Sequence, residues 1–455
     1  MYLLDHLYQI VWGVPLLVLI TGIGLYLSII LKGIQFRYLR YALHLALFSK
    51  PHEGEGKGDI SHFESLMTAL AGTIGIGNIA GVATAITIGG PGALFWMWVT
   101  ALLGMATKYA EAILAVKYRS IDEHGEMCGG PMHFIREGLG WNWLAAAFAI
   151  FGSIAALGGG NMLQANAVAD VMQSTFHVDP WISGICMAVF TGLTLLGGIK
   201  SIGKVASVLV PFMALFYIGG GILILIYCYD RIPHAFGVIF TTAFTGQAAY
   251  GGFAGSSIAL AMQVGISRGL MSSEAGMGTA SIAAAAAKSD MPGRQALVSM
   301  TGSFLATIVM CSITALVLGV TDVFGMLGTD GKILTGASLT VTAFQKIFPW
   351  GGYVVSIGLL LFAITTILGW AYYGEKCIEY LIGIKAVPFY RVLFTLVIIP
   401  GALMDLYVVW RISDIANGLM AFPNLIALAA LSGVVLSETK SFLKVLDAEL
   451  AEQKG

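Results

Sequence analysis

Long apolar runs, separated by short charged or Gly/Pro-rich stretches, divide the chain into eleven candidate membrane spans. Each is close to the roughly 20 residues that a helix needs to cross a bilayer. The expected spans are 14–31, 64–88, 92–117, 142–171, 181–198, 204–228, 238–263, 295–319, 351–374, 390–409 and 413–436. The pattern therefore predicts an all-α polytopic membrane protein.

Two segments between the expected spans are less regular. Residues 320–350 are less apolar and predict a long loop with one short helix near 338–348. Residues 265–290 are rich in small residues but carry Arg268 and Glu274. This mixture suggests a half-buried helix at the membrane interface, with the two charged side chains contributing to an inner gate.

Glycines interrupt the second and the seventh expected spans, at residues 69–81 and 246–257. Non-helical backbone at membrane depth is stable only where protein buries it or where it lines a watery cavity. Small residues also allow close helix packing without any role in binding. Two interrupted spans at matching positions of two halves favour a transporter's binding site. We expect two five-helix sets of opposite topology, 64–228 and 229–436, after an N-terminal segment 1–63 and before a tail 437–455.

Composition agrees with a membrane protein, because 57% of the residues are hydrophobic and only 11% are charged. A soluble domain normally carries about a quarter charged residues. The net charge of −1 and the absence of a basic tract in the sequence argue against nucleic-acid binding. The five cysteines are scattered without a CxxC pair, which predicts neither a disulfide framework nor a metal site.

Most lysines and arginines fall in segments that would be cytoplasmic if the N-terminus lay outside. The positive-inside rule therefore predicts an N-terminus outside and a C-terminus in the cytoplasm, in the plasma (inner) membrane.

The sequence supports an enzyme or a channel less well than a transporter. Residues 265–269 match the nucleophile string GxSxG, but no histidine follows the serine, as that chemistry requires. Residues 75–81 have GxGxxxG spacing rather than that of a dinucleotide-binding loop. A channel would show a continuous polar pore lining, whereas polarity here gathers at one depth. The sequence thus predicts no enzyme, and a passive facilitator stays as an alternative to a transporter.

Five short strings together resemble the signature of the alanine/glycine:cation symporters, over nearly the whole chain. They are TIGIGNIAGVATA at 73–85, GGPG at 89–92, GGPM at 129–132, GISRG at 265–269 and SEAG at 273–276. The resemblance implies a leucine-transporter-like fold, with one extra N-terminal helix before a five-plus-five inverted repeat. It implies cotransport of alanine or glycine with Na⁺, or with H⁺ in some members. We expect no organic cofactor and no obligate protein partner.

A zwitterionic amino acid needs partners for both of its charges. Backbone amides at the start of the second half-helix would hold the carboxylate, because a helix N-terminus is electropositive. Gly75, Ile76 and Gly77 would present these amides, with added bonds from the side chains of Thr73 and Asn78.

Other expected substrate contacts come from three further spans. Alignment of the seventh span with the broader fold assigns the ammonium to the carbonyls of Tyr250, Gly251 and Phe253, with Phe253 and Ser256 as pocket walls. Asn161 and Gln164 are three residues apart and share a helix face. We expect Gln164 to touch substrate, while Asn161 suits either substrate contact or helix-to-helix bonding. Trp370 would close one side of the pocket, unless it is an interfacial anchor.

The ninth span carries adjacent hydroxyls at Thr365 and Thr366, which suit a hard cation. Threonine in a membrane helix also commonly bonds back to its own backbone. The resemblance implies a Na⁺ site formed by these hydroxyls with the carbonyls of Ala71, Ile74 and Phe362. Thr366 would also line the substrate pocket.

Overall fold

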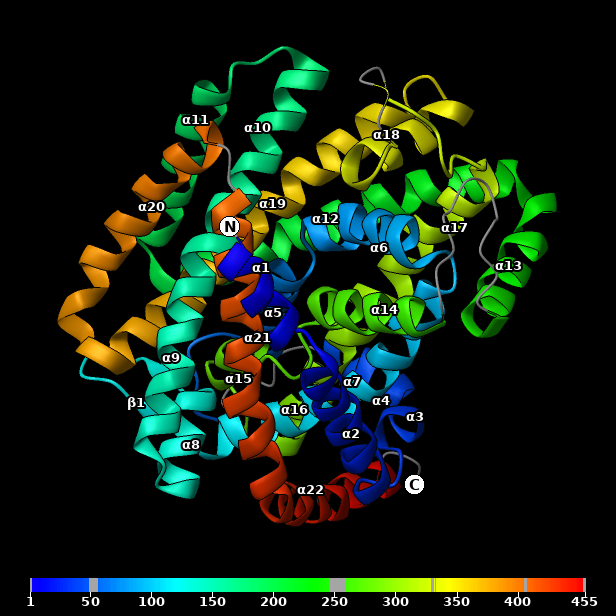
Figure 1. Ribbon diagram of the computed structural model, residues 1–455. Helices are drawn as coiled ribbons and strands as arrows, with labels where there is room; N and C mark the ends of the chain where they lie inside the picture. Colours follow the sequence, from blue (N-terminus) through cyan, green and yellow to red (C-terminus); the bar gives the residue numbers. More distant parts are fainter. Residues whose placement is uncertain are drawn as a thin grey trace.

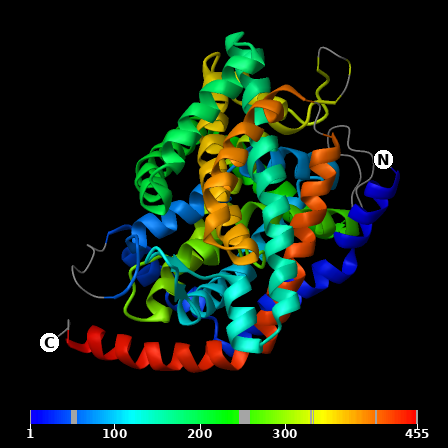
Figure 2. The same cartoon turned by 90° about the vertical axis from the view of Figure 1, so that its left-hand side faces the viewer.

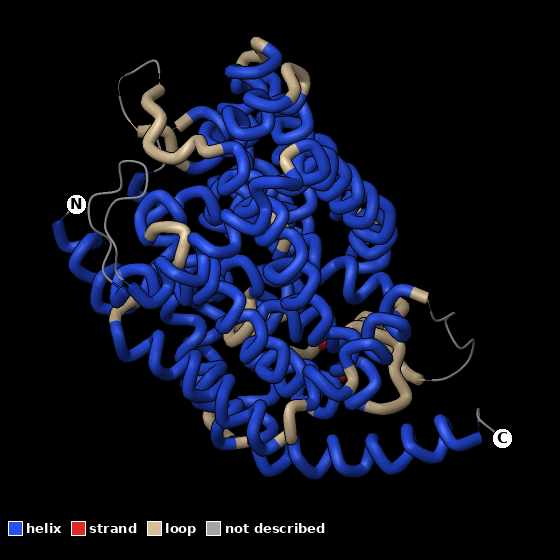
Figure 3. Tube along the Cα trace, turned by 90° about the vertical axis from the view of Figure 1, so that its right-hand side faces the viewer, coloured by secondary structure: helices blue, strands red, loops and turns tan. Residues whose placement is uncertain are grey.

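A computed structural model describes residues 2–48, 56–245, 258–328, 331, 333–404 and 407–452, and these are mostly helical (Figures 1 and 3). The strands in this part of the chain are β1 (Ser120–Ile121) and β2 (Met127–Cys128), which pair antiparallel. A mostly helical structure confirms the helical class predicted from the apolar runs.

The helices of the first half, including the short π-helical turns η1 and η2, have the following bounds: α1 Tyr2–Val11, α2 Val14–Ile30, α3 Ile34–Arg37, α4 Leu39–Leu47, α5 His62–Thr73, η1 Gly77–Gly81, α6 Val82–Gly89, α7 Ala93–Lys117, α8 Pro131–Leu139, α9 Asn142–Leu157, η2 Gly158–Met162, α10 Leu163–Phe176, α11 Pro180–Leu195 and α12 Gly198–Tyr227.

The helices of the second half, including the 3₁₀ turns η3 and η5 and the π-helical turn η4, have the following bounds: η3 Tyr229–Arg231, α13 Ile232–Thr245, α14 Ile258–Ser273, α15 Thr279–Ala285, α16 Pro292–Ser303, η4 Phe304–Cys311, α17 Ser312–Thr321, α18 Gly336–Ile347, α19 Gly351–Ile382, η5 Ile384–Ala386, α20 Val387–Leu403, α21 Tyr407–Ala430 and α22 Ser432–Glu452. Helix α18 lies close to the short helix expected near 338–348.

Within the described residues, eight helices are long and apolar enough to cross a membrane. The bent pair α5 and η1–α6 would make a ninth, and α11 is a shorter apolar helix. Large apolar side chains such as Leu193, Leu215 and Phe389 are exposed on the outer surface, as lipid contact requires. The chain is therefore a multi-pass membrane protein. Helix α22 lies across the lower end of the bundle (Figure 2).

The first expected helix break is present. A capping box formed by Ser61 and Glu64 starts α5, and α5 ends at Thr73. Ile74 is extended, with φ −86° and ψ 90°, and helical structure resumes as a π-helical turn at Gly77. The two halves meet at 56°. Single π-helical turns are frequent at functional sites.

A second break lies between α14 and α15, at residues 274–278, where Glu274, Gly276 and Gly278 have φ values of +53°, +93° and +81°. Left-handed backbone of this kind cannot continue a helix and favours glycine. The expectation of a half-buried interfacial helix over 265–290 was wrong, because the helix is broken at 274–278, most of α14 from Gly265 on is buried, and α15 is wholly buried. The break expected at 246–257 lies outside the described residues.

Glu111 of α7 holds the second break in place. The Oε1 atom of this buried side chain accepts the amides of Gly276 at 2.9 Å and Gly278 at 3.1 Å. Asn424 of α21 donates to the same oxygen at 2.7 Å. A buried carboxylate thus compensates amides that the non-helical backbone leaves unpaired.

The two broken helices pack side by side, with α15 against α5 and α14 against α6. Helices α7 and α16 pack around this pair, and α19 lies against α5. Helix α9 packs against both α19 and α21, while α11 packs on α20 farther out (Figure 1). Both breaks therefore lie inside the bundle, surrounded by continuous helices.

Candidate functional site

A cavity of about 250 Å³ lies between the two breaks. Its walls come from α5, η1, α6, η2, α10, α14, α19, α21 and the second break. The lining residues are Gly72, Thr73, Gly75, Ile76, Gly77, Ala80, Gly81, Thr84, Gly159, Leu163, Gln164, Arg268, Met271, Glu274, Met277, Thr366, Trp370, Trp410, Asp414 and Asn417.

The first break presents unpaired backbone amides beside this cavity. The amide of Gly75 donates to Asn78 Oδ1 at 3.2 Å. In the described part of the chain, no hydrogen bond satisfies the amides of Ile76 and Gly77, which belong to cavity-lining residues. These amides open the second half-helix, so the positive end of its dipole adds to their attraction for an anion.

Gly75 has no space for a side chain. A methyl group on its Cα would lie 2.6 Å from Thr366 Oγ1 and 3.4 Å from Gln164 Oε1. By contrast, a methyl group on Gly77 would meet no atom within 4 Å. The break therefore touches α19 at Gly75 and faces open space at Gly77.

Asn78, an expected substrate contact, and Asn161, for which substrate contact and helix-to-helix bonding were both open, donate to backbone carbonyls. Asn78 is fully buried and does not line the cavity; its Nδ2 donates to the carbonyls of Ala306 at 2.9 Å and Ser272 at 3.3 Å. Asn161 Nδ2 donates to the carbonyl of Phe394 at 2.6 Å, which is the helix-to-helix bond weighed for it above. Both amides are buried away from water, and the backbone carbonyls they bond offset that cost.

Gln164 and Trp370 do line the cavity. The Nε2 of Gln164 donates to the carbonyl of Gly159 at 3.2 Å, and its buried Oε1 has no hydrogen-bond partner. Trp370 Nε1 donates to the carbonyl of Gly72 at 3.2 Å, so the indole is a wall of the cavity and not an interfacial anchor. An unpartnered buried acceptor costs free energy and is a candidate for a ligand's donor.

Of the residues expected to bind Na⁺, Ala71, Ile74 and Thr366 lie where α19 meets the first break. Thr366 Oγ1 is 3.4 Å from the carbonyl oxygen of Ile74. Thr365 Oγ1 is 2.9 Å from the carbonyl oxygen of Phe362 and also contacts the sulfur of Met213. A methyl group on Gly369 would lie 2.6 Å from the amide nitrogen of Gly72, next to Ala71, so the two helices are in close contact. The Thr366 hydroxyl and the Ile74 carbonyl are neutral oxygens that lie close together, the kind of donor a hard cation prefers, whereas the Thr365 hydroxyl bonds within its own helix and contacts Met213 of α12.

Several cavity residues were not expected to bind substrate. Arg268 and Glu274 were assigned to a gate, and both line the cavity. Asp414, Trp410 and Asn417 of α21 also line it. Ionisable side chains inside a membrane protein are functional candidates by default. The sequence shows such side chains at Arg268, Glu274 and Asp414. The expected contacts at Tyr250, Gly251, Phe253 and Ser256 lie outside the described residues.

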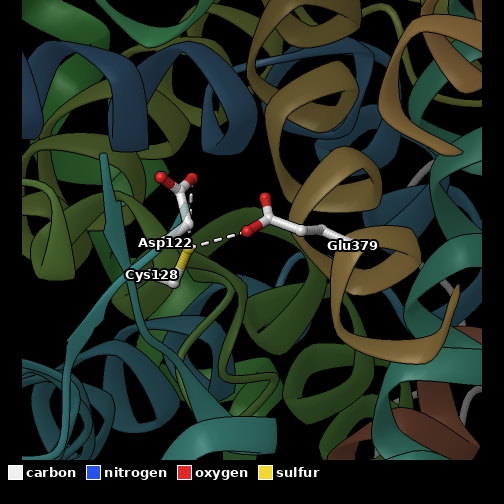
Figure 4. A group of neighbouring side chains, drawn as sticks. All are labelled: Asp122, Cys128 and Glu379. Carbon is white, nitrogen blue, oxygen red and sulfur yellow. Dashed lines mark hydrogen bonds between the residues drawn. The ribbon is translucent and has the colours of Figure 1, made fainter. Parts of the chain in front are cut away.

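A separate polar cluster forms near the β1–β2 hairpin, from Asp122, Cys128 and Glu379 (Figure 4). Cys128 Sγ donates to Glu379 Oε1 at 2.9 Å. Lys376 Nζ lies 2.9 Å from Glu379 Oε2, 3.4 Å from Cys128 Sγ and 3.5 Å from Asp122 Oδ2. The lysine ammonium therefore supplies the positive charge that a metal ion would bring to this ligand set.

The protonation of this cluster follows from its surroundings. Burial raises the pKa of the Cys128 thiol well above its usual range, so the thiol is unreactive. Burial also opposes ionisation of Asp122, but hydrogen bonds from the amides of Glu126 and His124 and the charge of Lys376 outweigh it and lower the Asp122 pKa. Residues far apart in sequence form this cluster, which the scattered cysteines did not suggest.

The arrangement of the helices is similar to that in solved structures. A structure of MhsT in complex with L-phenylalanine aligns with a TM-score of 0.60 at 14% identity, covering 84% of this chain and 93% of that one. A manganese transporter from Eremococcus coleocola aligns with a TM-score of 0.54 at 12% identity, covering 85% of this chain and 82% of that one. These neighbours have the leucine-transporter-like fold, and the likeness supports that fold here.

Sequence relatives share a higher identity with this chain than these solved structures do. The chain is 55% identical over 448 residues to the sodium/alanine symporter AgcS of Methanococcus maripaludis, with 97% of each chain covered. It is 33% identical to a putative sodium/proton-dependent alanine carrier protein, YrbD, and 32% identical to a probable sodium/glutamine symporter, GlnT, both of Bacillus subtilis. The first of these matches covers 95% of this chain and 90% of the relative, and the second covers 97% and 91%. The profile of the sodium:alanine symporter family matches residues 1–454. The chain therefore belongs to the sodium:alanine symporter family, a family of membrane transporters and not of enzymes.

Proposed function

We propose that this Na⁺-coupled amino acid symporter takes up alanine, glycine or both, by alternating access around the cavity between its two broken helices. The observation that carries the proposal is that the first break offers backbone amides to the cavity and a backbone carbonyl to α19. Its amides at Ile76 and Gly77 are unpaired beside the cavity. Its carbonyl at Ile74 lies 3.4 Å from Thr366 Oγ1 of α19.

The amides suit the carboxylate of an amino acid, since unpaired N–H groups at a helix N-terminus bind anions. Alanine is favoured by the relative at 55% identity, which is named a sodium/alanine symporter. The name of a more distant relative, at 32% identity, mentions glutamine, so substrate size varies among related chains. We propose the smaller substrates for this chain.

The same backbone segment explains how Na⁺ and substrate would be coupled. We place Na⁺ between the carbonyls of Ala71, Ile74 and Phe362 and the hydroxyls of Thr365 and Thr366. Binding of either ligand orders the break, and the second ligand then avoids that entropic cost. Coupling by H⁺ is the alternative, and the name of one relative mentions both ions.

The proposed architecture is eleven spans, with α2 preceding two inverted sets of five. The matching positions of the two breaks support it, because each break opens one set. The first set would run from α5 to α12 and the second from α14 to α21. With the N-terminus outside, the charged segments 56–61, 118–130 and 286–294 all face the cytoplasm, as the positive-inside rule favours.

Uptake into proteoliposomes tests the proposal. We expect radiolabelled alanine to accumulate above its external concentration when an inward Na⁺ gradient is imposed. A proton gradient imposed without Na⁺ would give no accumulation. Equilibration without accumulation under either gradient would establish a facilitator and contradict the proposal. Accumulation with the proton gradient alone would show that H⁺, and not Na⁺, is the coupling ion.

A further inference from the structure

Glu274 occupies the second break and lines the same cavity as the first. Its backbone is left-handed, with φ +53°, and the residue is only 2% exposed. The Oε2 atom accepts the hydroxyl of Thr279 at 3.0 Å and lies 3.2 Å from the hydroxyl of Thr73. Because Thr73 Oγ1 also donates to the carbonyl of Ala69 at 2.7 Å, its single proton is shared between two acceptors.

The carboxylate has no close cation. Within the described residues, no ion pair to Glu274 falls within 4.0 Å. Lys108 acts electrostatically on Glu274 and also on Glu111, so a single ammonium faces two buried carboxylates. With both carboxylates ionised, the group carries an excess negative charge. An uncompensated buried charge is costly, and a cation in the cavity relieves that cost.

The side of the cavity formed by the first break is electropositive. The unpaired amides of Ile76 and Gly77 lie at the start of a half-helix, as described above. Thr73 joins the two sides, because it ends α5 at the first break and its hydroxyl contacts Glu274. A zwitterion with its carboxylate on the amides would therefore bring its ammonium toward the second break.

We infer that the Glu274 carboxylate binds the ammonium of the transported amino acid, with the unpartnered Gln164 Oε1 as a further acceptor. The inference rests on the proposed function and adds to it a side-chain partner for the substrate's positive charge. Such a site requires both charges of a zwitterion. It would therefore reject a carboxylic acid that has a hydroxyl or a hydrogen in place of the ammonium.

Binding of [³H]alanine to the purified full-length protein at saturating Na⁺ tests the inference, with lactate as a competitor that keeps the carboxylate and lacks the ammonium. Glu274→Gln removes the charge at nearly constant shape. We expect it to weaken alanine binding roughly 10- to 100-fold, as loss of a charge-assisted hydrogen bond does. The inhibition constant of lactate should change less than about twofold.

The control is Glu137→Gln, the same chemical change on α8, at a side chain that is 51% exposed and outside the cavity. It should bind alanine as the wild type does. If Glu274→Gln lowers the yield of folded protein, Glu274→Asp keeps the charge and should give an intermediate loss. Unchanged alanine affinity in Glu274→Gln, equal losses for alanine and lactate, or a change confined to the Na⁺ requirement would each overturn the inference. Failure of the wild type to bind alanine would instead contradict the proposed function.

Discussion

At the scale of single residues, the cavity is defined by where side chains are missing and where polar atoms lack partners. Gly75 is required by contact, since a methyl group there would meet Thr366. The glycines alone predicted a helix break at this position. The sequence also predicted Thr73, Gln164, Thr366 and Trp370 as substrate contacts, and all four residues line the cavity. It misplaced Asn78, because nothing local shows that its amide bonds to carbonyls of α14 and η4.

Gly75→Ala should abolish alanine binding, because the added methyl group would lie 2.6 Å from Thr366 Oγ1 and push Thr366 away from the break. We expect an affinity loss of at least about 100-fold, measured by [³H]alanine binding at saturating Na⁺. Gly219→Ala on α12 is the matched control, since a methyl group there meets no atom within 4 Å. Retained binding in Gly75→Ala would mean that substrate does not use this part of the break.

Thr366→Ala should raise the Na⁺ concentration for half-maximal uptake roughly tenfold, since one neutral oxygen ligand of the proposed ion site is lost. Thr366→Ser keeps the hydroxyl and should stay near the wild-type value. The measurement is alanine uptake as a function of Na⁺ concentration at constant ionic strength. An unchanged Na⁺ dependence of uptake in Thr366→Ala would show that Thr366 is not a Na⁺ ligand.

At the scale of elements, the two breaks differ in how far sequence could reveal them. The first is visible because glycines and Asn78 interrupt an apolar run at mid-span. The second depends on Glu111 of α7 and Asn424 of α21, which compensate the backbone of residues 274–278 from far along the chain. Apolar windows alone placed the seventh span at 238–263, before this break, because charge at Arg268 and Glu274 lowers the local hydropathy.

Helix α8 carries a prediction about pH. Burial, with the nearby charges of Arg136 and Lys376, lowers the pKa of His133 from 6.5 to about 4. The folded state therefore keeps this imidazole neutral while the unfolded chain takes up a proton below about pH 6.5. Its contribution to stability is present above that pH and is lost as the pH falls toward 4, by up to about 1.4 kcal/mol per pH unit.

Thermal unfolding in detergent measures this effect. The Tm of the wild type should fall between pH 6.5 and pH 4.5, and His133→Gln should show a shallower fall over the same range. The exposed His124, in the β1–β2 turn, provides the control variant His124→Gln, which should follow the wild type. Identical pH profiles for wild type and His133→Gln would show that another group controls stability in this range.

At the scale of the whole molecule, composition and the lengths of the apolar runs were enough to predict a multi-pass helical protein. The packing of α5 on α15 and of α6 on α14 was not predictable, because it depends on where the second helix breaks. The described contacts place residues 57–60, 119 and 285–289 together, since Arg119 donates to the carbonyls of Lys57, Ala285 and Ala287. These segments therefore share one side of the membrane, as the proposed topology requires.

The orientation of that topology is testable by labelling in intact cells, with Cys186→Ser as background because Cys186 is exposed. A membrane-impermeant maleimide should label Asp179→Cys, between α10 and α11, from outside. Lys440→Cys on α22 should react only after permeabilisation. The reverse pattern would place the N-terminus in the cytoplasm.

The central claim is that substrate and Na⁺ share the first break, and equilibrium binding tests it most directly. Linkage requires each ligand to raise the affinity for the other by the same factor. We expect saturating Na⁺ to tighten alanine binding by about tenfold or more, alanine to tighten Na⁺ binding equally, and Thr366→Ala to abolish most of both effects. An alanine affinity that is the same with and without Na⁺ would contradict the account.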